Sequence, residues 1–168
     1  MSTNQLRPMT ATDLELVLAW RNHDDIRRYM YTQHEISLAE HTHWFERTHK
    51  ASGCHLLVFE VEQTPSGFIQ FTSKGDGGIA DWGFYLAPEA PKGTGSCLGK
   101  AALRYGFADL KLHKVCGQAL DYNSRSIRFH QSMGFTLEGV LRQQHYDGQK
   151  YHDIHCFGIL AKEWAKLD

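Results

Sequence analysis

A glycine-rich stretch, Lys92-Gly93-Thr94-Gly95-Ser96-Cys97, separates a predicted strand from a predicted helix. Glycine lets a backbone approach a ligand closely and adopt a positive φ. The first N–H groups of the following helix have no partner inside it and lie at the positive end of its dipole, so they favour a phosphate. The stretch lacks the GxxxxGK[ST] order of a P-loop. It predicts an anion site, with an ordinary glycine-rich turn as the alternative.

A second group of polar residues follows a later predicted strand. Asn123 and Ser126 open a predicted helix, and His130 lies seven residues after Asn123. An imidazole titrates near neutral pH and can serve as a proton donor. His130 is therefore a candidate general acid, with a surface histidine as the alternative reading.

Asp81 lies in the predicted strand that leads to the glycine-rich stretch. Strand alternation places Asp81, Gly83 and Tyr85 on one face, opposite Trp82. A carboxylate at this position could accept a proton from an amine, directly or through water. Asp81 is therefore a candidate general base.

The four cysteines and the histidine pair His41-Thr42-His43 carry weaker signals. The cysteines are far apart and share no CxxC spacing, and no apolar signal segment begins the chain, so we expect reduced thiols. No cysteine has an evident base partner, which argues against a covalent nucleophile. The HxH pair stands without an HExxH motif, so we expect no metal.

Composition limits the protein class. The 168 residues predict one domain over residues 1–168, and 42% apolar with 22% charged residues is typical of globular chains. A formal net charge of −1 argues against a nucleic-acid partner. No apolar run approaches the roughly 20 residues of a membrane helix, so we expect no membrane partner and a cytoplasmic protein.

The first half of the chain predicts helices followed by a meander. Thr12 with Glu15 and Ser37 with Glu40 have the spacing of capping boxes. The predicted helices run from Asp13 to about Arg21, from Asp24 to Met30 and onward from Ser37; the predicted strands are His55–Val61, Phe68–Ser73 and Ile79–Leu86, with turns at Thr64–Gly67 and Asp76–Gly78.

The second half predicts alternating helices and strands. Gly134 should end the second helix, and Asp147-Gly148 is a strong hairpin signal. The elements are a helix Cys97–Leu110, a strand His113–Leu120, a helix Ser124–Met133, and hairpin strands Val140–Tyr146 and Tyr151–Leu160. Together the segments predict a mixed α/β fold.

These motifs resemble those of the GNAT superfamily of N-acetyltransferases. Lys92–Cys97 resembles its pyrophosphate loop, although Lys92 stands for the usual Arg or Gln and Cys97 for a small residue. Asn123, Ser126, His130 and Gly134-Phe135 match its later motif, and Glu138-Gly139 with Arg142 resembles the branch of ribosomal-protein acetyltransferases. The match covers nearly the whole chain.

The resemblance implies a single domain with a mostly antiparallel mixed sheet of about seven strands, flanked by helices and opened between two parallel strands. It implies acetyl-CoA as co-substrate, direct attack by an amine without an acyl-enzyme, His130 at the place of a Tyr that protonates the CoA sulfur, and an oxyanion donor among the N–H groups of residues 85–87. The implied acetyl-CoA contacts are Tyr85, Leu86, Lys92, Gly93, Thr94, Gly95, Ser96, Cys97, Asn123 and Ser126.

The N-terminal third resembles one group more closely, the UDP-4-amino-4,6-dideoxy-N-acetyl-β-L-altrosamine N-acetyltransferases of pseudaminic acid synthesis, which serves flagellin and surface glycan modification. The matching segments are Trp20–His23, Met30-Tyr31, Ile36-Ser37, His41–Trp44 and Ser126–His130. The resemblance implies a nucleotide-linked amino sugar as partner. Arg21, His41, Thr72 and Tyr85 are then expected near the diphosphate, Met30, Tyr31 and Trp44 near the sugar, and Gln118 in the same substrate set.

Physical chemistry agrees with this assignment, because Arg binds phosphate oxygens bidentately and Met or an aromatic ring suits a deoxysugar methyl group. Trp44 in a core and Arg21 as a helix cap are the alternatives. Two other functions stay open: a protein N-terminal or polyamine acetyltransferase, and a non-catalytic acyl-CoA-binding module. A homodimer is an assembly that the sequence leaves open.

Overall fold

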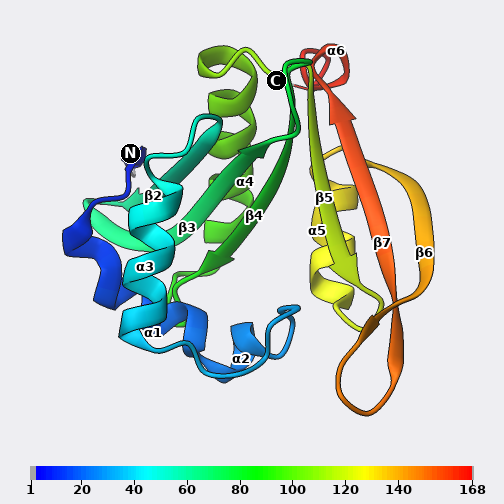
Figure 1. The fold of residues 1–168 in the computed structure, drawn as a ribbon. Coiled ribbons are helices and arrows are strands. Elements are labelled where there is room, and N and C mark those ends of the chain that lie inside the picture. The colour runs from blue at the N-terminus through cyan, green and yellow to red at the C-terminus, as the bar shows by residue number, and fades with distance from the viewer. Residues whose placement is uncertain (1–2, 168) are drawn as a thin grey trace. The chain divides into compact units, whose positions relative to one another are not determined.

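The computed structural model describes residues 3–167 (Figure 1). They form two compact units, the first running to Thr72 and including Gly83–Ala102, the second comprising Ser73–Trp82 and the chain from Leu103 onward. Seven strands of this part of the chain form one sheet in the order β1-β2-β3-β4-β5-β7-β6. Strand β4 (Ile79–Leu86) belongs to both units and has the bounds that the sequence predicts.

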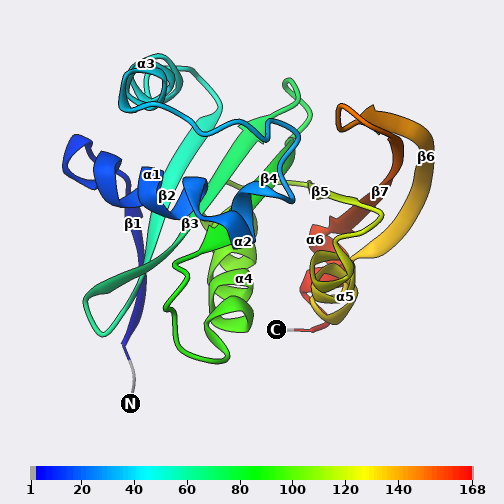
Figure 2. The ribbon, with the colours of Figure 1, turned by 90° about the horizontal axis from the view of Figure 1, so that it is seen from below.

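The first unit holds the N-terminal strands and helices. Figure 2 shows α1 and α3 on one face of its strands and α4 on the other. Its core gathers Val17, Trp20, Phe45, Val58 and Phe68. The elements are β1 (Asn4–Pro8), a 3-10 turn (Ala11–Asp13), α1 (Leu14–Asn22), α2 (Asp24–Arg27), α3 (Leu38–Thr48), β2 (Cys54–Val61), β3 (Thr64–Ser73) and the start of α4 (Thr94–Arg104).

The start of the chain differs from the sequence prediction, because β1 was not expected and pairs antiparallel with β2. Arg7 holds it in place through Glu60 at 2.7 Å and through two nitrogens on the Asp13 carboxylate at 2.8 and 2.9 Å. The Thr10 N–H donates to Asp13 at 2.8 Å. The predicted cap at Thr12 is therefore wrong, since the helix entry is built from Thr10 and Asp13.

The predicted start of α3 is confirmed. The Glu40 N–H donates to Ser37 Oγ at 3.1 Å, and the Ser37 N–H donates to a Glu40 carboxylate oxygen at 2.9 Å. This reciprocal cap satisfies two backbone donors that would otherwise have no helical partner. It fixes the helix that carries His41, Phe45 and Thr48 on its buried face.

The turn between β2 and β3 lies earlier than predicted. Glu62 and Gln63 have positive φ angles of 50° and 64° and form the reversal, whereas the predicted turn Thr64–Gly67 lies inside β3. Gly67 allows a close approach, since a Cβ there would lie 2.6 Å from a methyl carbon of Leu98. The glycine was read as a turn signal, but it serves the packing of α4 on the sheet.

The second unit contains the C-terminal half of the sheet. The β4–β5 pair is parallel, whereas the pairs β1–β2, β2–β3, β5–β7 and β6–β7 are antiparallel, which confirms the predicted mixed α/β fold class. That a single domain covers the whole chain stays a prediction. The elements are the end of α4, a π-helical segment (Tyr105–Asp109), β5 (Lys114–Leu120), α5 (Ser124–Ser132), β6 (Thr136–Tyr146), β7 (Tyr151–Leu160) and α6 (Ala161–Trp164).

Gly134 ends α5 as predicted, with a φ of +89° that a side chain would strain. Two predicted elements of this unit have other bounds. The helix predicted from Cys97 to Leu110 begins at Thr94 and changes to π-helical geometry after Arg104. Strand β6 begins at Thr136, because it pairs with β7 from that residue onward.

All helices in the described residues are short. The longest, α3 and α4, have 11 residues each, whereas a bilayer requires about 20. Within residues 3–167, therefore, no helix has both the length and the apolar character to cross a membrane.

Candidate active site

The glycine-rich stretch forms the beginning of α4. Gly93 has a φ of +90°, and the Thr94 hydroxyl donates to the Pro91 carbonyl at 2.7 Å. The Cys97 N–H donates to the Gly93 carbonyl at 3.3 Å. Helix α4 thus starts three residues earlier than predicted, and its first turn carries N–H groups at the positive end of an 11-residue helix. Lys92 is exposed just before it, which fits an anionic group.

Arg21 lies at the end of α1 with its guanidinium half-buried. One nitrogen, Nη2, donates to the Thr32 carbonyl at 2.9 Å. The other, Nη1, is buried and has no hydrogen-bond partner among the described residues. Burial lowers the pKa of Arg21, but a guanidinium stays charged in proteins. A buried cation with an unused donor is costly unless an anion meets it.

His41 on α3 is the second polar group without a full set of partners. His41 is only 4% exposed, and its Nε2 has no hydrogen-bond partner within residues 3–167. Burial lowers its pKa, a hydrogen bond to the Leu14 backbone opposes the shift, and the nearby Arg21 charge lowers it further. The ring is therefore neutral at pH 7, with one nitrogen available.

Aromatic rings connect these groups into one wall of the first unit. His41 stacks on Trp44 at 5.1 Å between centroids, Trp44 meets the edge of Phe68 at 6.0 Å, and Phe68 stacks on Tyr85 at 5.0 Å. Burial raises the pKa of Tyr85, and the Arg21 charge opposes the rise. Four of the residues expected in the substrate site thus lie close together: Arg21, His41, Trp44 and Tyr85. Phe68 packs against Trp44 and Tyr85.

Phe68 was not singled out because it stands in an ordinary apolar strand pattern, and the structure places it in the core at 3% exposure, packed against Trp44 and Tyr85. Nothing in its spacing separates a ring that lines a site from a ring that fills a core. Its position between Trp44 and Tyr85 becomes visible only when β3, β4 and α3 pack.

The other expected substrate residues occupy diverse settings. Met30 is half-buried just after α2, Tyr31 is 49% exposed, and the Thr72 hydroxyl accepts a hydrogen bond from Gln70 at 3.1 Å. Gln118 is exposed on β5 of the second unit, with its amide 3.9 Å from the Cys156 sulfur. Their part in a site stays a prediction.

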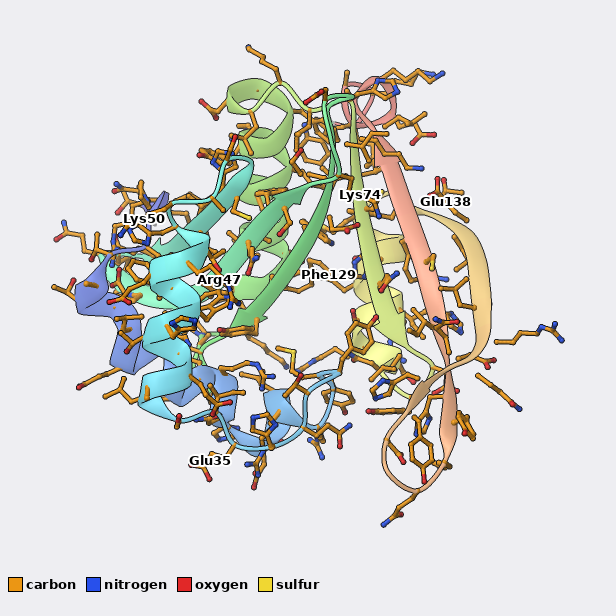
Figure 3. All side chains as sticks on the ribbon, viewed as in Figure 1. Glu35, Arg47, Lys50, Lys74, Phe129 and Glu138 are labelled. Carbon is orange, nitrogen blue, oxygen red and sulfur yellow. The ribbon has the colours of Figure 1, made fainter. Side chains whose placement is uncertain are left out.

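Asn123 and Ser126 begin α5 in the second unit. The Ser126 N–H donates to Asn123 Oδ1 at 3.2 Å, so Asn123 caps the helix. Asp81 on β4 is half-exposed and pairs with the Lys74 ammonium at 3.3 Å. Figure 3 labels Lys74, which lies in the segment after β3. The Asp81 side chain is 49% exposed, so solvent reaches the carboxylate.

His130 lies in the core of the second unit and is only 1% exposed. The Trp82 indole N–H donates to its Nε2 at 3.0 Å, and its Nδ1 lies 2.8 Å from the Ser126 carbonyl. Phe157 stacks on the ring at 4.9 Å, and Phe135 meets it edge-on at 5.0 Å. Burial lowers the pKa of His130. The surface-histidine reading is wrong, and the general-acid role stays a prediction.

Comparison with known proteins places the fold in one family. The sequence profile of the acetyltransferase (GNAT) domain matches residues 5–136. The acetyltransferase PseH of Campylobacter jejuni strain 81-176 is 29% identical over 132 residues, 77% of this chain and 80% of the relative. The uncharacterized N-acetyltransferase YokL of Bacillus subtilis, from the SPbeta prophage, is 30% identical over 145 residues, 84% of this chain and 81% of the relative.

Solved structures share the same fold. A crystal structure of spermidine N-acetyltransferase from Vibrio cholerae, in complex with CoA and spermine, superposes with a TM-score of 0.89 at 23% identity, covering 96% of this chain and 98% of the other. At that identity the likeness concerns the fold. The family profile shows that the chain belongs to the acetyltransferase (GNAT) family, and with the PseH relative and the shared fold it identifies the chain as an acetyl-CoA-dependent N-acetyltransferase.

Proposed function

We propose that the acceptor is a nucleotide-linked amino sugar and that the enzyme acetylates the 4-amino group of a UDP-linked 4-amino-4,6-dideoxy sugar, as in pseudaminic acid synthesis for flagellin and surface glycans. One observation carries the proposal. Arg21 Nη1 and His41 Nε2 are both buried, both lack a hydrogen-bond partner among the described residues, and their residues are close enough to influence each other's electrostatics. A ligand that satisfies both must offer anionic oxygens or a set of hydroxyl groups.

A diphosphate meets these requirements. Its oxygens accept charge-assisted hydrogen bonds from the free Arg21 nitrogen. Because the other ring nitrogen of His41 is held at the Leu14 backbone, Nε2 can accept from a hydroxyl while neutral or donate to a phosphate once protonated. A nearby phosphate charge favours the protonated form. The two residues can therefore act as one anion-binding pair.

A polyamine fits the same region less well. It would bring positive charges beside the buried Arg21 guanidinium. The acidic residues around α2 already have cationic partners: Asp24 pairs with Arg27 at 3.0 Å, and Asp25 pairs with Arg28 at 2.6 Å. The remaining charge balance in this segment favours an anionic acceptor.

The sugar would lie against apolar and aromatic side chains. Trp44 is half-buried in the aromatic wall of the first unit, and Met30 and Tyr31 follow α2. A methyl group of a deoxysugar is accommodated by such surfaces. We assign Trp44, Met30 and Tyr31 to the sugar, and Thr72 and Gln118 to the same substrate set.

We assign acetyl-CoA to the first turn of α4 and its surroundings. The pyrophosphate would accept from the N–H groups of that turn, as helix N-termini favour anions. The Ala87 N–H is already donated to the Ser66 carbonyl at 2.9 Å, which narrows the oxyanion donors to Tyr85 and Leu86. The proposed contacts are Tyr85, Leu86, Lys92, Gly93, Thr94, Gly95, Ser96, Cys97, Asn123 and Ser126.

The chemistry follows from these assignments. The neutral amine attacks the thioester carbonyl, a C–N bond forms, the C–S bond breaks and CoA leaves as thiolate. Asp81 takes the proton that the amine loses, directly or through water. A backbone N–H of Tyr85 or Leu86 stabilises the negative charge on the carbonyl oxygen during attack.

A panel of acceptors tests the proposal. Release of free CoA thiol is measured with UDP-linked 4-amino-4,6-dideoxy sugars, spermidine, spermine and peptides with free N-termini. We expect the highest kcat/KM with a nucleotide-linked amino sugar. A higher value with spermidine or a peptide would replace the assignment by one of the alternative acetyltransferases. Acetyl-CoA binding without turnover of any acceptor in the panel would contradict the nucleotide-linked amino sugar as acceptor.

A further inference from the structure

The point at which β4 leaves β5 is built from side chains that the reaction scheme above does not use. The parallel ladder consists of Ile79 with Lys114, Ala80 with Val115 and Asp81 with Cys116. The residues that follow are Trp82 on β4 and Gly117 on β5. Both are buried in the second unit.

His130 joins this point through a hydrogen bond of fixed direction. The Trp82 indole can only donate, so His130 Nε2 must accept at 3.0 Å. The Ser126 carbonyl can only accept, so His130 Nδ1 must carry the proton at 2.8 Å. The partners thus select the neutral tautomer with its lone pair at Nε2. That nitrogen has no proton to give to a thiolate.

Gly117 makes room for this contact. A Cβ there would overlap His130 Nε2 and would lie 2.7 Å from the Trp82 indole nitrogen. Aromatic rings pack against both partners: Phe135 stacks on Trp82 at 4.9 Å and meets His130 edge-on at 5.0 Å, and Phe129, labelled on α5 in Figure 3, stacks on Trp82 at 6.2 Å. The glycine and the rings define one arrangement in which the hydrogen bond forms.

We propose that His130 is a positioning residue for acetyl transfer rather than its general acid: its acceptor nitrogen holds the Trp82 indole over Gly117 and thereby fixes where β4 leaves β5. Trp82 directly precedes Gly83–Leu86, which includes the proposed oxyanion donors. Through the chain, the hydrogen bond constrains the donors that must meet acetyl-CoA. The thiolate departs without this proton, which is reasonable for a thiol with a pKa of about 8.5.

Three single variants and one double variant separate positioning from acid catalysis. His130→Gln keeps an acceptor for Trp82 but cannot supply a proton at neutral pH. His130→Leu removes the acceptor, and Trp82→Phe removes the donor. Acetyl-CoA affinity is measured by calorimetry, kcat and its pH profile by thiol release with the best acceptor of the panel, and folding by thermal unfolding.

Positioning predicts a specific pattern. His130→Gln should keep kcat within about threefold of wild type and leave the pH profile unchanged, because the hydrogen bond from Trp82 is retained. Such a bond contributes about 0.5–1.5 kcal/mol net. His130→Leu and Trp82→Phe should each lower kcat/KM for acetyl-CoA by about three- to tenfold. The double variant Trp82→Phe/His130→Leu should lose no more than the worse single variant.

Acid catalysis predicts the opposite pattern. His130→Gln would then lose about 10²–10⁴-fold in kcat, whereas Trp82→Phe would stay near wild type. Either result overturns the proposal, as do additive losses in the double variant. If His130→Leu or Trp82→Phe fails to fold, His130→Gln still decides, because a side chain that cannot ionise cannot replace an acid.

Discussion

His41 in the first unit and His130 in the second differ in whether both of their ring nitrogens have hydrogen-bond partners. Both are buried, and burial lowers the pKa of both. His130 has partners at both ring nitrogens, Trp82 and the Ser126 carbonyl. His41 retains a buried Nε2 without a partner among the described residues. Because buried polar atoms are nearly always hydrogen-bonded, the unmatched atom indicates a ligand and the matched ring indicates a structural role.

A third buried histidine shows that burial alone does not set the charge. His152, on β7, lies between Asp147 at 2.7 Å and Asp121 at 3.1 Å. The two carboxylates raise its pKa, with the Asp147 hydrogen bond as the largest cause. The two carboxylates thus favour the charged form of His152, whereas burial favours the neutral forms of His41 and His130. The partners of each ring, more than its exposure, predict what it does.

The largest expected effect comes from removing the anion-binding pair. The double variant Arg21→Ala/His41→Phe should raise KM for the UDP-linked amino sugar by about 10²–10³-fold, because two hydrogen bonds, one of them charge-assisted, are lost. Calorimetry should find acetyl-CoA affinity nearly unchanged. Arg47→Ala, on an exposed arginine of α3, is the matched control and should behave as wild type. An equal rise in KM in the control and in the double variant would show that Arg21 and His41 do not form a specific site for the nucleotide.

A smaller effect concerns the proton on His41. Its pKa is lowered in the free protein, and a phosphate should raise it, so nucleotide binding should take up a proton. We expect UDP affinity to rise as pH falls through the neutral range, by at most about tenfold per pH unit for one linked proton. His41→Phe should abolish this dependence. Calorimetry in buffers of different ionisation enthalpy measures the uptake, and a proton count of zero in the wild type would contradict a His41–phosphate contact.

The smallest effect concerns the stability of the β6–β7 hairpin. The pKa of His152 is higher in the folded protein than its unfolded value near 6.5, so the charged ring stabilises the fold below about pH 6.5. This stabilisation is lost as the pH rises through the folded pKa. The thermal midpoint should therefore fall as the pH rises from about 6.5 through the folded value. His152→Gln should flatten that fall, while His130→Gln should not. A wild-type midpoint that stays constant as the pH rises above about 6.5 would mean that the folded pKa of His152 is not raised.

Local signals predicted much of the fold. Strand Ile79–Leu86 and the Ser37–Glu40 cap follow from short-range patterns, and the structure reproduces both. Strand β1 was missed because it is short and mostly polar, and Arg7 holds it through Glu60, 53 residues away. The β2–β3 turn was misplaced because Glu62 and Gln63 adopt positive φ without the usual glycine.

The candidate site shows the same limit. The resemblance grouped Arg21 and His41, but only the structure identifies which of their atoms lack partners. The tautomer of His130 depends on Trp82, 48 residues earlier in the chain, and on the space above Gly117. Gly117, a lone glycine inside a predicted strand, was the one sequence signal of this close approach.

Acceptors with and without the nucleotide show whether Arg21 recognises the nucleotide. kcat/KM is measured for the UDP-linked 4-amino-4,6-dideoxy sugar and for the same sugar without the nucleotide, in the wild type and in Arg21→Ala. We predict a strong preference for the nucleotide form in the wild type. In Arg21→Ala the preference should shrink by about ten- to a hundredfold, since a charge-assisted hydrogen bond contributes about 1.5–3 kcal/mol. Equal kcat/KM for the two acceptors in the wild type, or an unchanged ratio in Arg21→Ala, would contradict recognition of the nucleotide by Arg21.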